Sequence, residues 1–222
     1  MYLLKYIIIG DSGTGKTSIA TRFNDNSFYT DTDMTIGVDF FSRVITFPST
    51  SVSSSSSYKI QLFDTAGQER FTCITRSFFK DCCGVILTYD VTNKQSLYKA
   101  INYWLPLITK ECSINTKIIL VGNKNESTKR QVDTKEGETM TKLKRINDFC
   151  ECSAKKGDIM DIFYKLTEMV MKSTKDDDEL PIGLKWISNE SVPMKVVHMK
   201  DDEDDERKEE ESVKSSCCLP FF

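Results

Sequence analysis

The sequence predicts an α/β domain built on a mixed, mostly parallel sheet of six strands flanked by about five helices. Short apolar runs at 3–9, 85–89 and 117–121 are each followed by loop residues and then by a helix-like pattern. That alternation is typical of parallel strands joined by helices. Residues 39–47 and 58–64 instead alternate apolar and polar side chains around a serine-rich connector, which indicates an antiparallel hairpin.

Helices are expected after Lys16 and over 95–110, 134–145 and 159–172. The last of these segments places five apolar residues on one face, and this stripe is expected to close a single core: Ile159, Ile162, Phe163, Leu166 and Val170.

Periodicity ends near Lys172, so we expect one domain over 1–172 and a disordered acidic tail over 173–222. Residues 176–214 hold 14 acidic against 6 basic side chains, a composition that favours a solvated chain over a packed one. The serine run at 49–57 is interpreted as a low-complexity insertion in the hairpin loop.

Composition excludes several classes of protein. No apolar run reaches the roughly 20 residues that span a bilayer, and the opening segment 1–9 lacks the parts of a signal peptide. The eight cysteines are therefore not expected to form a disulfide framework, and a reducing cytosol is the expected compartment. No dense basic stripe with interleaved aromatics is present, so nucleic acid is not an expected partner.

Residues 10–17 read GDSGTGKT and match the phosphate-loop pattern GxxxxGK[ST] between an apolar strand and a helical segment. Such a loop curls its backbone N–H groups around phosphate oxygens at a helix N-terminus. Lys16 is expected to reach the β- and γ-phosphates, and the Thr17 hydroxyl to ligate Mg²⁺. The other nucleotide contacts expected here are Ser12, Gly13, Thr14, Gly15 and Ser18.

Asp64 ends the strand at 58–64 and opens the motif DTAGQERF over 64–71. An acid at a strand end beside the phosphate loop is suited to the metal. Gly67 can turn its N–H toward a γ-phosphate because no side chain blocks the approach, and Gln68 can orient an attacking water. The predicted catalytic residues are Gly67, Gln68 and Lys16, and Asp64 is a predicted metal ligand.

Further motifs are TIGVDF at 35–40, RSFF at 76–79 and LTYDVTN at 87–93. With them, residues 6–172 resemble the Rab branch of the Ras-like small GTPases, whose fold is the P-loop NTPase G domain. The resemblance implies that Thr35 gives its hydroxyl to Mg²⁺ and its N–H to the γ-phosphate, so that switch segments order around that phosphate. It also implies that Phe28 packs against the base and that an effector surface is formed by Phe40, Phe63 and Phe78, with Phe63 in place of the more usual Trp.

NKNE at 123–126 aligns with the guanine-reading pattern NKxD, and ECSAK at 151–155 with the second base loop, which includes Ser153 and Lys155. Asn123 and Lys124 keep the pattern, and the Ala154 N–H is expected to donate to the guanine O6. Glu126 extends the carboxylate by about 1.5 Å, whereas N–H···O distances span only about 2.7–3.2 Å. We therefore expect guanine preference with weaker binding or faster exchange.

Cys217 and Cys218 resemble the paired cysteines that receive geranylgeranyl groups in Rab proteins, although four residues follow them. The ending is not a CaaX box, because Leu219 stands where that motif needs its cysteine. An acidic tail is repelled by anionic lipids, so lipid chains are expected to supply the anchor.

The expected function is a GTP/GDP switch in vesicle and membrane traffic, with slow hydrolysis because no arginine finger in cis can be assigned. The resemblance implies effectors, an exchange factor, an activating protein, a prenylation escort and a GDP-dissociation inhibitor. It also implies a place on the cytoplasmic face of intracellular membranes, cycling with the cytosol. Two alternatives stay open: a non-cycling nucleotide-bound scaffold, suggested by Glu126 and Met34, and a P-loop kinase or ATPase.

Overall fold

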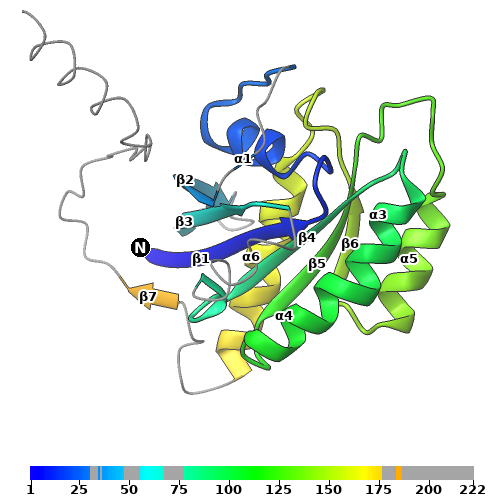
Figure 1. The fold of residues 1–222 in the computed structure, drawn as a ribbon. Coiled ribbons are helices and arrows are strands. Elements are labelled where there is room, and N and C mark those ends of the chain that lie inside the picture. Colours follow the sequence, from blue (N-terminus) through cyan, green and yellow to red (C-terminus); the bar gives the residue numbers. More distant parts are fainter. Residues whose placement is uncertain (31–34, 36, 48–55, 68–77, 177–183, 187–222) are drawn as a thin grey trace, which may run out of the picture.

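The computed structural model describes residues 1–30, 35, 37–47, 56–67, 78–176 and 184–186. One sheet holds its six main strands in the order β2-β3-β1-β4-β5-β6 (Figure 1). These strands are β1 (Tyr2–Gly10), β2 (Val38–Phe47), β3 (Ser56–Thr65), β4 (Gly84–Asp90), β5 (Lys117–Asn123) and β6 (Asp148–Glu151). The helices are α1 (Lys16–Asp25), α3 (Lys94–Lys99), η2 (Ala100–Trp104), α4 (Leu105–Glu111), α5 (Thr134–Leu143) and α6 (Met160–Asp176).

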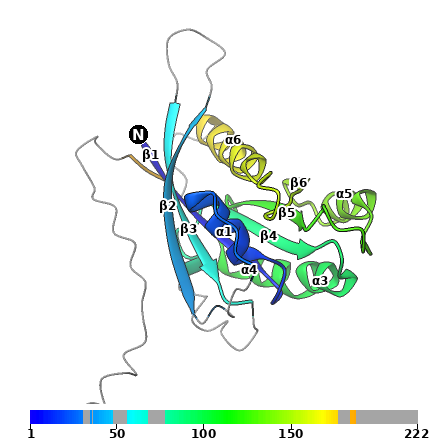
Figure 2. The same cartoon turned by 90° about the horizontal axis from the view of Figure 1, so that it is seen from above.

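Strand pairing confirms the predicted mixed, mostly parallel sheet. β1 pairs in parallel with β3 and β4, and β4, β5 and β6 continue in parallel. β2 runs antiparallel to β3, and Figure 2 shows the two as a long paired ribbon at one edge of the sheet. β6 was not predicted from an apolar run, because its four residues, DFCE, are only partly buried and include two acidic side chains.

Two hydrophobic clusters cover the two faces of the sheet. Leu4, Tyr6 and Ile8 of β1 pack into the cluster under α1 and α6, whereas Ile7 and Ile9 pack into the cluster under α3, η2, α4 and α5 (Figure 1). This division follows from the alternation of side chains along a strand. Because both faces are covered, the central strands read as unbroken apolar runs.

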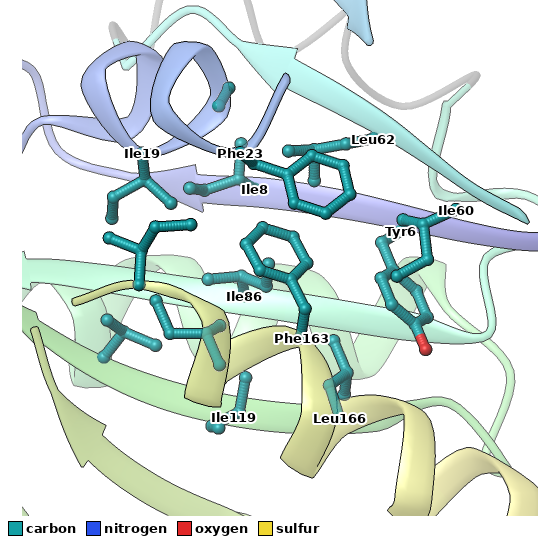
Figure 3. Close-up of a cluster of buried hydrophobic side chains, with 14 of the residues drawn as sticks. Tyr6, Ile8, Ile19, Phe23, Ile60, Leu62, Ile86, Ile119, Phe163 and Leu166 are labelled. Carbon is teal, nitrogen blue, oxygen red and sulfur yellow. The ribbon is translucent and has the colours of Figure 1, made fainter. Parts of the chain in front are cut away.

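The predicted α6 stripe lies in the first cluster. Figure 3 shows Phe163 of α6 facing Phe23 of α1, and their ring centroids are 3.9 Å apart at an interplanar angle of 23°. This contact joins the helix that follows the phosphate loop to the last helix of the domain.

The helix expected over 95–110 spans α3, η2 and α4, with a π-helical turn at Ala100–Trp104. Pro106 is the second residue after that turn and has no N–H to donate to the preceding turn of the helix. The wider π turn accommodates the missing hydrogen bond.

Structure continues past the predicted domain end at Lys172. α6 ends at Asp176, and a short strand, β7 (Leu184–Trp186), pairs antiparallel with Tyr2–Leu4 of β1. On the same edge of β1, β4 pairs from Tyr6 onward. β7 pairs with the part of this edge that precedes Tyr6. The serine insertion predicted over 49–57 extends too far, because Ser56 and Ser57 begin β3 and pair with Phe47 and Thr46 of β2. Its remaining residues, the rest of the acidic tail, and Cys217 and Cys218 lie outside the described residues. Within the described ranges, no helix has the length and apolarity needed to cross a bilayer.

Replacing Phe163 by Ala is expected to destabilise the fold by about 3–5 kcal/mol, because it empties the contact with Phe23 at the centre of a packed core. Chemical denaturation with GDP and Mg²⁺ held constant measures the change. Ile114→Ala is the control, since that side chain is 95% exposed and its removal should change stability by less than about 0.5 kcal/mol. Equal midpoints for the two variants would contradict the role of this contact.

Candidate nucleotide site

The candidate site lies where the parallel strands β1, β4, β5 and β6 reach their carboxyl ends, the edge at which ligands of open α/β sheets bind. A cavity of about 370 Å³ opens there. Of the residues predicted to hold the nucleotide, all except Thr14 and Ser153 line it: Ser12, Gly13, Gly15, Lys16, Thr17, Ser18, Phe28, Thr35, Gly67, Asn123, Lys124, Glu126, Ala154 and Lys155.

The phosphate loop places Gly15 at the N-cap of α1 with φ 86°, a left-handed conformation that favours glycine. A Cβ at this position would also collide with Nδ2 of Asn123. Gly15 brings no side chain to cap the helix, and the described residues supply no other cap, so the first N–H groups of α1 are available to an anion. Thr14 is buried and donates its hydroxyl to the Asp11 carbonyl at 2.9 Å, which shapes the turn from behind the cavity.

Lys16 lines the cavity and is buried, with only 6% of its surface exposed. Its Nζ donates to the Asp11 carbonyl at 2.9 Å. Burial lowers the pKa of Lys16, while the carboxylates of Asp64 and Asp11 raise it. A Cβ at Gly67 would collide with this Nζ and lie 2.7 Å from the Ser12 nitrogen, so only glycine fits beside the phosphate loop here. Gln68 lies outside the described residues.

Three oxygen-bearing side chains meet at the predicted metal position. The Thr17 hydroxyl donates to Asp64 Oδ2 at 2.6 Å and lies 2.8 Å from the Thr35 hydroxyl. Burial raises the pKa of Asp64 to about 6, against the opposing effects of the Thr17 hydrogen bond and Lys16. Its Oδ1 is buried and has no hydrogen-bond partner among the described residues. Two hydroxyls and an unsatisfied carboxylate oxygen are ligands that Mg²⁺ accepts, so these residues fit the ion.

Asn123 connects the phosphate end to the base end. Its Nδ2 donates to the Thr14 carbonyl at 2.9 Å, and its Oδ1 accepts the Ala154 N–H at 3.2 Å. The sequence suggested that the Ala154 N–H would point at a guanine O6, whereas here it is engaged by Asn123. A long bond of this kind can be shared, so O6 binding requires the N–H to bifurcate or to turn from Asn123.

Lys124 stands at φ 66°, in the left-handed region that side chains rarely adopt. Its Nζ donates to the Gly13 carbonyl at 2.7 Å and pairs with Asp90 Oδ2 at 2.6 Å. The other oxygen of Asp90 accepts both the N–H and the hydroxyl of Thr92. Asp90 was not among the predicted site residues. Its only signal was its place at the end of a buried strand, within the motif LTYDVTN.

Glu126 lines the base end of the cavity, where its Oε2 is buried and finds no hydrogen-bond partner within the described part of the chain. Phe28 forms another wall and packs partly against the core. Tyr29 and Thr30 also line the cavity, although no motif marked them.

Ser153 was predicted to contact the nucleotide but is buried behind the cavity wall. Its N–H donates to Asp158 at 2.5 Å, and its hydroxyl accepts the Lys156 N–H at 2.9 Å.

The predicted effector residues are brought together on β2, β3 and the segment before β4. The Phe63 ring centroid lies 5.2 Å from that of Phe40 and 5.4 Å from that of Phe78. All three side chains are partly exposed. Lys5 Nζ lies 5.2 Å from the Phe63 centroid and donates to the Lys80 carbonyl. The result is a small apolar surface with a cation at its margin.

Comparison with known proteins decides the family. A model described as the Ras family matches residues 5–172. The chain belongs to the Ras family. It is 38% identical over 200 residues to a probable Ras-related protein Rab-4A of Echinococcus multilocularis, covering 89% of this chain and 86% of that one. It is 37% identical to Ras-related protein RAB1BV of Beta vulgaris, over 80% of each chain. It is 35% identical to Ras-related protein Rab-12 of Mus musculus, over 77% of this chain and 68% of that one.

This Ras-family chain is therefore a Rab-like small GTPase: it binds guanine nucleotide, hydrolyses GTP and works in membrane traffic. The P-loop G-domain fold expected from the sequence is confirmed by the family match and the sheet.

Asp90→Asn is expected to speed release of a fluorescent GDP analogue by about threefold to tenfold, because Lys124 loses the charged partner that holds it across the phosphate loop. Asn keeps an acceptor for Thr92, so the loop itself is preserved. Asp148→Asn is the matched control: its pair with Lys165 spans 3.6 Å and touches no cavity residue. Release rates that are the same in both variants would show that Asp90 has no part in holding the nucleotide.

Proposed function

We propose that this Rab-like GTPase is a Mg²⁺-dependent switch whose 370 Å³ cavity holds GDP or GTP in one orientation. The observation that carries the proposal is the order of side chains around this cavity. Lys16 and Thr17 line one end, and Glu126 and Ala154 line the other. A cation and helix N-terminus suit phosphates, whereas a carboxylate and a backbone loop suit the edge of guanine.

The chain's own groups have distinct parts in this proposal. The N–H groups at the start of α1 bind phosphate oxygens, and Lys16 exchanges the Asp11 carbonyl for a phosphate oxygen. Gly67 presents its N–H beside them, and Gln68 orients the attacking water, as the family resemblance implies. Lys16 then balances the negative charge that develops as the bond to the γ-phosphoryl group breaks. An activating protein that adds an arginine is worth about 10³–10⁵ in rate, so intrinsic turnover is slow.

Thr17, Thr35 and Asp64 would hold Mg²⁺, which when bound neutralises charge on the β- and γ-phosphates. Thr35 lies in the chain just before β2, and its hydroxyl joins this cluster through its contact with the Thr17 hydroxyl. Ordering of the chain ahead of the effector residue Phe40 is thereby linked to the occupied phosphate site.

Asp64→Asn is expected to remove most of the influence of Mg²⁺ on nucleotide release. Chelating Mg²⁺ should speed GDP release at least about tenfold in the unaltered protein, and by no more than about threefold in the variant. Asp39→Asn is the control, because Asp39 is exposed and opposes Asp64 across the β2–β3 pair without bonding Thr17. An undiminished response to chelation in Asp64→Asn would rule out the proposed metal site.

Glu126 is proposed to accept hydrogen bonds from guanine N1 and the exocyclic amine. Its buried, unpartnered Oε2 supports this assignment, because a buried oxygen without a donor is costly until a ligand satisfies it. The longer side chain brings the carboxylate closer to the base than aspartate would, so at least one of the two bonds departs from ideal length.

Glu126→Asp is expected to slow GDP release by about tenfold, since restoring one charged hydrogen bond is worth about 1.5–3 kcal/mol. The same substitution should slow release of inosine diphosphate less, because that ligand lacks the exocyclic amine. Stopped-flow release of fluorescent analogues measures both rates. A GDP off-rate that the substitution leaves unchanged would show that the extra methylene is accommodated at no cost.

Partners are proposed for the aromatic surface, the nucleotide site and the C-terminal cysteines. Effectors are proposed to contact the Phe40, Phe63 and Phe78 surface in the GTP state, and an exchange factor and an activating protein to act on the nucleotide site. Geranylgeranyl groups on Cys217 and Cys218, with an escort and a GDP-dissociation inhibitor, would place the protein on the cytoplasmic face of intracellular membranes in exchange with the cytosol. Two lipid chains give durable attachment where one gives marginal binding.

Replacing Cys217 and Cys218 together by Ser is expected to leave the full-length protein in the soluble fraction of cells, because the tail carries no basic cluster to hold it on anionic lipid. Fractionation and mass spectrometry of the C-terminal peptide measure location and lipid together. Cys112→Ser, within the folded domain, is the control. Membrane attachment that survives the double substitution would contradict the lipid proposal.

No observation favours the non-cycling scaffold. The chain retains Gly67, Gln68 and Thr35, which the hydrolysis proposal uses, and the curated relatives carry Rab names. A P-loop kinase or ATPase is not supported either, because the family match covers both base-reading loops.

A further inference from the structure

We propose that Arg22 is a positioning residue for guanine recognition, which fixes the 151–155 loop and the Phe28 ring relative to α1 and so sets how long the nucleotide stays bound. The inference rests on the proposed function, because it concerns the base end of the same cavity. Arg22 does not line that cavity, and no motif in the sequence marked it.

The Arg22 guanidinium uses all three of its nitrogens. Nε donates to the Ala154 carbonyl at 2.9 Å, and Nη2 donates to the Lys155 carbonyl at 3.0 Å. Nη1 donates to the Asn26 carbonyl, just past the end of α1. The guanidinium carbon also lies 5.9 Å from the centroid of the Phe28 ring, within the range of a cation–π contact. One planar group thus touches two walls of the cavity from behind.

Ala154 is held at both of its backbone groups by these contacts. Its N–H donates to Asn123 Oδ1, and its C=O accepts from Arg22 Nε. The orientation of that N–H decides whether it can serve the guanine O6. The Ala154 N–H belongs to the Ser153–Ala154 peptide, and the two carbonyls that Arg22 holds belong to the next two peptides along the chain. Because those two peptides are fixed by Arg22, Ala154 and its N–H can turn only if one of these hydrogen bonds breaks.

α1 carries this constraint from one end of the nucleotide to the other. Its N-terminus supplies the N–H groups of the phosphate site, and Arg22 stands in its last turn. Movement of the 151–155 loop away from α1 therefore lengthens the distance between the phosphate contacts and the base contacts. A ligand that bridges both ends is released more readily when that distance is free to vary.

A competing interpretation is that Arg22 only closes the end of α1. Arg22 accepts the Asn26 N–H at its own carbonyl and donates to the Asn26 carbonyl, which together resemble a helix cap. A cap alone predicts a loss of stability with no particular effect at the base. Lysine separates the two interpretations in part, because it keeps the favourable charge at the helix end but lacks the planar fork that reaches several carbonyls at once.

Arg43 of β2 provides a matched control, because it contacts the same helix, α1, at Phe23. Its guanidinium carbon lies 5.9 Å from the Phe23 ring centroid, and its Nη1 donates to the Phe23 carbonyl at 2.5 Å. The chemistry is that of Arg22, an arginine over a phenyl ring and a backbone carbonyl, but neither contact of Arg43 within the described residues involves a residue that lines the cavity.

The test compares Arg22→Met, Arg22→Lys and Arg43→Met in the full-length protein loaded with Mg²⁺ and a fluorescent GDP analogue. Release from Arg22→Met is expected to be at least about tenfold faster, with Arg22→Lys intermediate, because two hydrogen bonds of a charged group are lost. Release from Arg43→Met is expected to stay within about twofold of the unaltered protein. Melting temperatures of the three variants show how much of any change is general destabilisation.

Two further measurements distinguish positioning of the 151–155 loop by Arg22 from a general loosening of the nucleotide site. Single-turnover hydrolysis of bound GTP should change by a smaller factor than nucleotide release does in Arg22→Met, because the guanidinium contacts the base end and not the phosphate end. The acceleration of release should be the same for inosine diphosphate, which keeps the O6 that Ala154 serves and lacks the exocyclic amine that Glu126 serves. If Arg22→Met and Arg43→Met release nucleotide alike, if hydrolysis falls by the same factor as release rises, or if the acceleration is lost with inosine diphosphate, the inference is overturned. Failure of the unaltered protein to retain any guanine nucleotide would instead overturn the proposed function, and this inference with it.

Discussion

The buried side chain of Asn123 bonds the phosphate loop to the 151–155 loop, and the shape of the nucleotide site depends on that link. Only 2% of the residue is exposed, and its amide donates to Thr14 and accepts from Ala154. A buried amide is stable only when both of its ends are satisfied, so each loop must keep its backbone in place for the other. The phosphate end and the base end are therefore one constrained unit.

The sheet makes this link possible by aligning the ends of its parallel strands. In the register of the sheet, Gly10 of β1 is opposite Thr88 of β4, Asp90 of β4 is opposite Asn123 of β5, and Gly122 of β5 is opposite Glu151 of β6. Motifs that are far apart in the chain are thus brought to one edge. A Cβ at Gly10 would collide with the Thr88 carbonyl, so the close approach of β1 to β4 at this edge requires glycine.

Sequence patterns predicted the parts of the site that local rules control. The P-loop, the apolar strands and the helical stripe of α6 are each set by residues close together in the chain. The contacts of Asp90 with Lys124 and of Arg22 with Ala154 were not predicted, because each depends on strand register and on the path of a loop far away in sequence. Tyr29 and Thr30 gave no signal beyond their position after Phe28. β7 was missed because its three residues gain a partner only at the edge of β1 that β4 leaves free.

At the base end, Glu126 has an unpartnered oxygen within the described residues and the Ala154 N–H is bonded to Asn123, so both groups must adjust when guanine binds. At the phosphate end, Lys16, Thr17 and Asp64 are already close together. The most direct measurement is to denature freshly purified protein, then identify and count the nucleotide that it releases. We expect about one guanine nucleotide per chain, since a single cavity joins both ends. An empty site, or adenine nucleotide in its place, would contradict a guanine switch in which the longer carboxylate is accommodated.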